Sequence, residues 1–232
     1  MGKPVAPLKG LRGICLGLWG ALLLFSYSSE RLNLLVRAPL QPVIGLAGVV
    51  LLLLAGLDMA MGQGQGRQRL PRRELVSWLL GGMVAVAMLL LPPEPSFSHL
   101  AASRGSGQML QEEISFVLPA GQRSLTDWVR LLRAAPDPKL YDGDPVRISG
   151  FVLAVPGEPP QLARLLVRCC LADATPIGLP VRWPPGKPLP KTNQWLAIEG
   201  VMGIDSSDGQ AHSLVLPSRI SPIPRPKRPF EG

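Results

Sequence analysis

Residues 40–61 read LQPVIGLAGVVLLLLAGLDMAM, an apolar run whose single charged side chain, Asp58, lies near its end. A run of about 20 apolar residues is long enough to cross the ~30 Å hydrocarbon core of a bilayer as a helix. Residues 11–27 and 75–91 flank this run at 17 residues each, and neither contains a charge beyond its first two positions. The pattern predicts a membrane α-helical bundle of three helices, or of two if one shorter segment does not cross.

Small residues mark one side of the first segment. Gly13, Gly17 and Ala21 recur every four residues, so they would form one smooth stripe along a helix. Such a stripe lets a neighbouring helix approach closely. We therefore expect residues 11–27 to pack against another helix, either within the chain or in another subunit.

Basic residues predict how the segments are oriented. The first 12 residues and the loop 62–74 carry seven Lys/Arg: Lys3, Lys9, Arg12, Arg67, Arg69, Arg72 and Arg73. The loop 28–39 between the first two segments carries two. Because short cytoplasmic loops are enriched in Lys and Arg, the N-terminus is expected to be cytoplasmic. With three crossings the rest of the chain is extracytoplasmic, whereas with two crossings it would be cytoplasmic.

The charge distribution argues against a nucleic-acid partner. Residues 1–91 carry nine Lys/Arg and three Asp/Glu, a net charge of +6 out of the total of +8. The basic excess therefore lies at helix ends next to a lipid bilayer, not on a folded domain where it could neutralise phosphates. We expect an integral membrane protein.

The pattern changes after Leu91. Residues 92–110 are rich in Pro, Ser, Gly and Ala and predict a linker, residues 111–221 predict a soluble β-rich domain, and residues 222–232 form a proline-rich basic tail. Ser124 and Asp127 resemble a capping box, which predicts a short helix over 125–134. Five runs with a period of two follow, separated by Gly and Pro. They favour an OB-like five-stranded barrel, in which Gly150 would permit a tight bend.

Adjacent cysteines are the most unusual feature of the soluble part. Cys169 and Cys170 are followed closely by Asp173, and thiolates with a carboxylate are ligands for a metal ion. In a regular strand, however, the two thiols would point to opposite faces and could not share an ion. Only a bulge or turn at Cys170 would bring them together. Three interpretations stay open: a metal site at Cys169, Cys170 and Asp173, with His212 as a further candidate ligand, a redox-active thiol pair, or ordinary packing.

Several motifs together resemble a known family. They are Tyr141-x-Gly143, Val146-x-Ile148-x-Gly150-Phe151-Val152, Cys169-Cys170-x-Ala172-Asp173-Ala174 and Trp195-x-x-x-x-Gly200, after N-terminal membrane helices and before a proline-rich end. This arrangement is similar to the YcgQ-like family, whose members are described as predicted subunits of a two-component membrane permease complex. The resemblance implies a polytopic permease as partner and no enzyme activity.

These observations lead to one functional expectation and one alternative. We expect a non-enzymatic accessory subunit of a permease or transport complex, whose extracytoplasmic β-domain binds or hands over a solute or metal ion. The tentative metal ligands are Cys169, Cys170 and Asp173. The alternative is a membrane-anchored thiol oxidoreductase that uses the Cys169–Cys170 pair, which would require a thiol of low pKa.

Overall fold

The computed structural model describes residues 10–61, 72–91, 95–103, 118–206 and 209–231. The chain divides into two compact units, Met1–Glu94 and Pro95–Gly232. The first unit is helical, and the second is built around a β-sheet.

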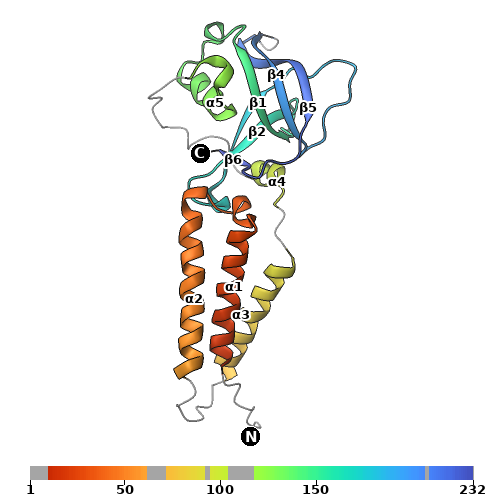
Figure 1. Ribbon diagram of the computed structural model, residues 1–232. Coiled ribbons are helices and arrows are strands. Elements are labelled where there is room, and N and C mark those ends of the chain that lie inside the picture. The colour runs from red at the N-terminus through yellow and green to blue at the C-terminus, as the bar shows by residue number, and fades with distance from the viewer. Residues whose placement is uncertain (1–9, 62–71, 92–94, 104–117, 207–208, 232) are drawn as a thin grey trace. The chain divides into compact units, whose positions relative to one another are not determined.

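The first unit consists of α1 (Leu11–Ser28), α2 (Gln41–Met61) and α3 (Arg72–Leu90) (Figure 1). Two short 3₁₀ turns, Arg31–Leu34 and Ala38–Leu40, connect α1 to α2. All three helices are long and apolar enough to cross a membrane. The three predicted segments are confirmed as helices of that length and composition, with boundaries within three residues of those expected.

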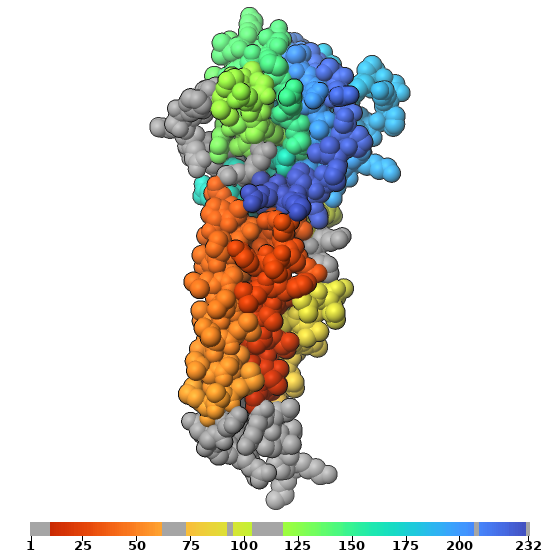
Figure 2. Space-filling view, viewed as in Figure 1, coloured from red at the N-terminus to blue at the C-terminus, as the bar shows by residue number. Residues whose placement is uncertain are grey.

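Glycines allow α1 and α2 to pack closely, and Figure 2 shows the two helices in contact along their length. A Cβ atom on Gly20 would lie 2.9 Å from the carbonyl oxygen of Gly48, and one on Gly48 would lie 3.0 Å from Leu24 Cγ. Gly13 faces Asp58 and Met59 in the same interface. The expected stripe therefore exists in part, because Ala21 is exposed and Gly20 takes its place.

Polar contacts lie at both ends of the helical unit. Near the start of α1, Arg12 Nε lies 4.0 Å from Asp58 Oδ1 on α2. At the other end, Arg31 donates to the carbonyl oxygen of Leu89 in the last turn of α3 at 3.3 Å. Arg12 is largely exposed, so this pair brings a basic side chain of α1 near the one carboxylate of α2 and contributes little to stability.

The second unit contains a sheet with the order β3-β2-β1-β4-β5, in which every neighbouring pair is antiparallel. The strands are β1 (Pro145–Leu153), β2 (Gln161–Leu166), β3 (Thr175–Pro180), β4 (Trp195–Asp205) and β5 (His212–Pro222). A sixth strand, β6 (Phe230–Glu231), pairs parallel with the end of β2. All five predicted runs contain a strand of this sheet.

The expected OB-like five-stranded barrel is not borne out. The sheet is open, and its two edge strands have no ladder between them within the described residues. They are joined at one isolated parallel bridge, Val181 to Val215, where the Arg182 N–H donates to the Val215 carbonyl at 3.0 Å. Pro180 ends β3 at this point, and proline has no N–H to extend a ladder. Gly150 does lie at a close approach, because a Cβ atom there would overlap the Ala163 carbonyl oxygen.

Helix α5 (Leu125–Ala134) covers one side of the sheet, and its boundaries match the prediction. Ser124 Oγ accepts from the Asp127 N–H at 3.2 Å, and Asp127 Oδ2 accepts from the Ser124 N–H at 2.9 Å. This is the expected capping box with a shorter carboxylate. Side chains of β1 to β5 form the hydrophobic core of this unit. The helix contributes Leu125, Trp128 and Val129 to it.

The predicted linker and the predicted tail each contain regular secondary structure. Residues 97–102, within the predicted linker, form α4 (Phe97–Ala102), while most of the rest of that linker lies outside the described residues. Phe97 packs against Phe151, Trp195 and Phe230, each at 5.8 Å between ring centroids. The proline-rich tail ends in β6 and is therefore fixed to the domain through Phe230 and through Pro229, which is buried.

Arg164 holds this tail in place from β2. The side chain is 8% exposed, and its Nη1 donates to the Pro229 carbonyl oxygen at 3.0 Å. Its Nε and Nη2 donate to the backbone oxygen and Oγ of Ser149, both at 2.8 Å, and its guanidinium lies 5.0 Å from the Trp195 ring centroid. Through these contacts the tail covers Arg164.

Candidate functional site

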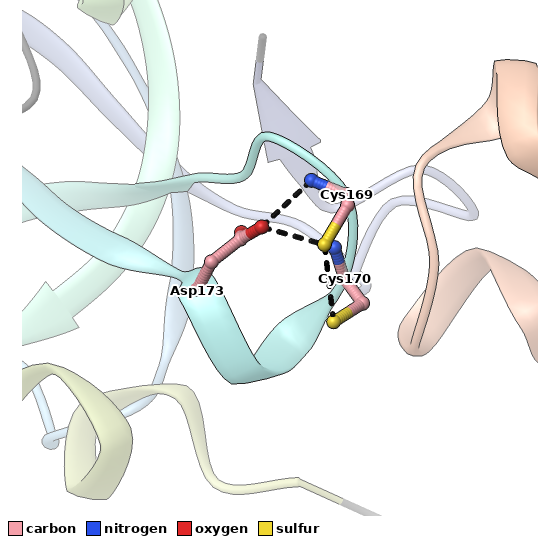
Figure 3. A group of neighbouring side chains, drawn as sticks. All are labelled: Cys169, Cys170 and Asp173. Carbon is pink, nitrogen blue, oxygen red and sulfur yellow. Dashed lines mark hydrogen bonds between the residues drawn. The ribbon is translucent and has the colours of Figure 1, made fainter.

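The two adjacent cysteines lie in a loop, not in a strand. β2 ends at Leu166, and a 3₁₀ turn follows at Leu171–Asp173. The prediction of a regular strand, in which the thiols would point apart, is therefore wrong. The structure shows the alternative, a turn at Cys170. As a result the two Sγ atoms lie 3.5 Å apart, with both thiols free (Figure 3).

Asp173 gathers this loop around its carboxylate, which points toward both cysteines (Figure 3). Oδ2 accepts from the Cys169 N–H at 2.8 Å and from the Cys170 N–H at 3.4 Å. Oδ1 accepts from the Arg168 N–H at 3.0 Å. Three consecutive backbone donors thus converge on one side chain, and this convergence bends the chain so that the sulfurs become neighbours.

The electrostatics of the loop follow from these contacts. The Asp173 carboxylate, and then Cys170, accept hydrogen bonds from the Cys169 thiol and raise its pKa to about 12. Burial opposes ionisation of Asp173, but the Cys169 thiol and the three backbone N–H groups outweigh it and lower the pKa of the carboxyl. At neutral pH the loop therefore holds an ionised carboxylate beside a protonated thiol.

The arrangement is chemically suited to a thiophilic cation. One ligand atom each from Cys169, Cys170 and Asp173 lies within 4.8 Å of the others, and among the described residues these three are the group that forms such a cluster. His212, the other ligand considered, is not part of it. A bound cation would favour the deprotonated thiols, because metal binding displaces thiol protons. Cys169 is exposed and Cys170 partly so, which gives an ion access from solvent.

A groove at the open edge of the sheet was not predicted. Its volume is about 940 Å³, and its lining includes Trp183, Arg182, Asp205, His212 and Ser213. Arg182 Nη2 lies 3.5 Å from Asp205 Oδ1, and the Trp183 indole N–H donates to the Pro160 carbonyl at 2.8 Å. Asp205 is the last residue of β4. No local motif signals the groove, because its lining comes from five separate stretches of the chain: 158–161, 180–183, 189, 205 and 212–214.

Fold and site together define a class: a protein with three helices that are long and apolar enough to span a membrane, and with a β-domain that carries a dithiol–carboxylate cluster. Residues 124–230 match the family model of the DUF1980 C-terminal domain. The match includes α5, β1 to β5, the cysteine loop and the first residue of β6, and it is compatible with the YcgQ-like resemblance. No curated protein and no solved structure is similar enough to the chain to give a match.

Proposed function

We propose that this chain is a non-enzymatic accessory subunit of a membrane transport complex, and that its β-domain binds a thiophilic metal ion and hands it to a polytopic permease. The proposal is supported by three helices of spanning length, by a cluster of thiols and a carboxylate, and by the resemblance to predicted permease subunits. The observation that carries it is the pair of Sγ atoms 3.5 Å apart in an exposed loop.

An accessible site of this kind suits transfer better than storage. Structural metal sites are closed by four protein ligands, whereas this cluster offers three and leaves one sulfur exposed. An ion bound here keeps positions that a ligand on another protein can take. Handing the ion over therefore requires no unfolding of the domain.

Surface on the helical unit is available for a partner. Of an 18-residue apolar stretch in each helix, only 6% is buried in α3 and 17% in α2. Large side chains such as Leu46, Leu53 and Met83 are more than 60% exposed. These faces suit lipid and the helices of a permease alike, because both are apolar.

The positive-inside bias places the β-domain on the extracytoplasmic side in this proposal. Residues 1–12 and 62–74 together carry seven Lys/Arg, against two in residues 28–39 between α1 and α2. An extracytoplasmic dithiol would meet metal ions before they reach the permease.

The alternative, a thiol oxidoreductase, has less support from the geometry. Attack on a disulfide requires a thiolate, and reactive cysteines have a lowered pKa. The hydrogen bonds from Cys169 to Asp173 and Cys170 raise the pKa of this thiol to about 12 instead. Metal binding removes that obstacle, since the ion itself displaces the proton.

The proposal is tested by purifying the full-length protein in mild detergent under reducing conditions. We expect one metal ion per chain in the wild type, none in the Cys169→Ser/Cys170→Ser double variant, and a polytopic permease that co-purifies with both. The Cys15→Ala variant is the matched control, because Cys15 is buried and donates to the Trp78 carbonyl. Equal metal content in the wild type and the double variant would refute a metal role, and a chain that purifies alone would refute the accessory role.

A further inference from the structure

The Asp173 carboxylate is already committed to its own loop. An ionised carboxylate has about four lone-pair sites for hydrogen bonds or ligation. Three of them accept backbone N–H groups, from Arg168 at 3.0 Å, Cys169 at 2.8 Å and Cys170 at 3.4 Å. If Asp173 swung out to ligate an ion, these three donors would lose their acceptor, and the bend that brings the sulfurs together would lose its support.

The spacing of the sulfurs indicates which coordination geometry they fit. The Sγ atoms are 3.5 Å apart, and with metal–sulfur bonds of about 2.3 Å they subtend roughly 100° at the ion. That angle is close to the tetrahedral angle of about 109° found in zinc sites. A linear two-coordinate ion such as Cu⁺ would need the sulfurs about 4.6 Å apart at the same bond length.

We infer that the two sulfurs alone chelate a four-coordinate thiophilic dication of the Zn²⁺ class, and that Asp173 is a positioning residue, not a ligand. The inference rests on the proposed function and names its cargo. Two coordination positions then face away from the loop, open to water or to donors from another protein. Asp173 acts by presenting the two thiols at the chelating distance.

Phenylarsine oxide separates positioning from ligation. Trivalent arsenic condenses with two thiols, forming two As–S bonds and releasing one water that takes the oxide oxygen and both thiol protons. The reaction needs two close sulfurs and no carboxylate. A carboxylate that positions the thiols therefore affects arsenical and zinc binding alike, whereas a carboxylate that ligates the ion affects zinc alone.

The experiment uses the full-length protein carrying Cys15→Ala, reduced and in detergent. We measure Zn²⁺ affinity by competition with a chromophoric chelator, and phenylarsine oxide affinity by loss of free thiols. Asp173→Asn makes the Cys169 proton easier to displace, which by itself favours binding, but the lost positioning of the thiols should outweigh this and weaken both by a similar factor, about tenfold to a hundredfold. Asp173→Glu, which keeps both carboxylate oxygens at a displaced position, should fall between the wild type and Asp173→Asn, and it replaces Asp173→Asn if that variant does not fold.

X-ray absorption of the zinc-loaded wild type should show two sulfurs and two lighter ligands. Weaker zinc binding with unchanged arsenical binding in Asp173→Asn would overturn the positioning role. Cu⁺ bound through two sulfurs by a protein that does not bind Zn²⁺ would overturn the class of ion and leave the proposed function standing. Failure of both Zn²⁺ and Cu⁺ to bind would instead refute the metal role in the proposed function.

Discussion

At the scale of single residues, one side chain explains why the two thiols do not point in the directions that the alternating sequence predicts. In the sequence Cys169 and Cys170 continue an alternating run, which by itself predicts thiols on opposite faces. Asp173 reverses this outcome by accepting from three consecutive N–H groups. The sequence pattern named the three residues of this cluster and left the turn at Cys170 open as one alternative, because a period of two does not show that the carboxylate binds the backbone.

The pH dependence of the Cys169 thiol follows from the same contacts. Its pKa, raised to about 12, keeps it protonated through neutral and mildly alkaline pH. In a Cys15→Ala/Cys170→Ala background, Asp173→Asn removes the carboxylate and should bring the pKa back toward the ordinary range of about 8.5. We expect iodoacetamide to alkylate Cys169 at least about tenfold faster at pH 8 in this variant, since the thiolate is the nucleophile.

The alkylation is followed by mass spectrometry between pH 7 and pH 10. The rate in the parent should rise steadily across this window, because the fraction of thiolate grows up to the raised pKa. In the Asp173→Asn variant the rate should level off near pH 9. A parent rate that levels off near pH 8.5 would contradict the role of Asp173 in raising the pKa.

Gly200 lies at a point in the sheet where there is no space for a Cβ atom. It lies at the bulge between Glu199 and Gly200 in β4, and a Cβ atom there would overlap the Leu216 carbonyl oxygen. Gly200→Ala should therefore destabilise the β-domain by about 1–3 kcal/mol, the usual cost of overpacking. Gly121→Ala is the control, because the nearest atom to its Cβ would be Pro145 Cγ at 3.9 Å. Denaturant unfolding monitored by tryptophan fluorescence compares the two, and equal midpoints would refute the steric argument.

At the scale of elements, the membrane helices pack through glycine. Gly48 and Gly56 both lie on α2, but a Cβ atom on Gly48 would meet Leu24 at 3.0 Å, whereas one on Gly56 would meet nothing within 4 Å. Gly48→Val should separate α1 from α2 and lower the thermal stability of the protein in detergent. Gly56→Val should be tolerated, since its side chain points away from the other helices. Matching losses in both variants would show that α2 does not use this face.

The C-terminal tail should contribute to stability through β6. Phe230 packs on Phe97, and its backbone pairs with Leu165 of β2. Phe230→Ala should lower the free energy of unfolding by about 1–3 kcal/mol, less than a fully buried Phe because the side chain is only partly enclosed. Arg228→Ala, an exposed change two residues earlier, should have little effect. An unfolding midpoint that Phe230→Ala leaves unchanged would show that the tail adds nothing to the domain.

Elements with a strong local signal were predictable, and those that depend on distant partners were not. α5 begins and ends where its capping box and hydrophobic stripe place it, and each alternating run contains a strand. α4 and β6 escaped prediction because each is short and is held by distant contacts, as Phe97 is by Trp195. Closure of the sheet depends on how its edge strands meet, which a period of two does not encode.

At the scale of the whole molecule, the open question is the side of the membrane on which the cysteine loop lies. Lys and Arg counts predict a cytoplasmic N-terminus and an extracytoplasmic β-domain. The proposed function needs that orientation, because a thiol pair that receives ions ahead of a permease must face the compartment from which they arrive. Two crossings instead of three would reverse the outcome.

A membrane-impermeant maleimide applied to intact cells decides this orientation. In a background without Cys15, Cys169 and Cys170, single cysteines are introduced at Ser29, just after α1, and at Met61, the last residue of α2. Both positions are exposed and lie at opposite ends of the antiparallel pair α1–α2. We expect Ser29→Cys to be labelled in intact cells, and Met61→Cys only after permeabilisation.

Cys169 itself, as the single remaining cysteine, reports on α3. If α3 crosses the membrane, Cys169 should be labelled in intact cells together with Ser29→Cys, and more slowly because its pKa is raised. Raising the labelling pH from 7 to 9 should speed the reaction of Cys169 without changing which side is labelled. Labelling of Cys169 with the same pattern as Met61→Cys would mean that α3 does not span, that the thiol pair faces the cytoplasm, and that ion transfer at this site would have to follow transport.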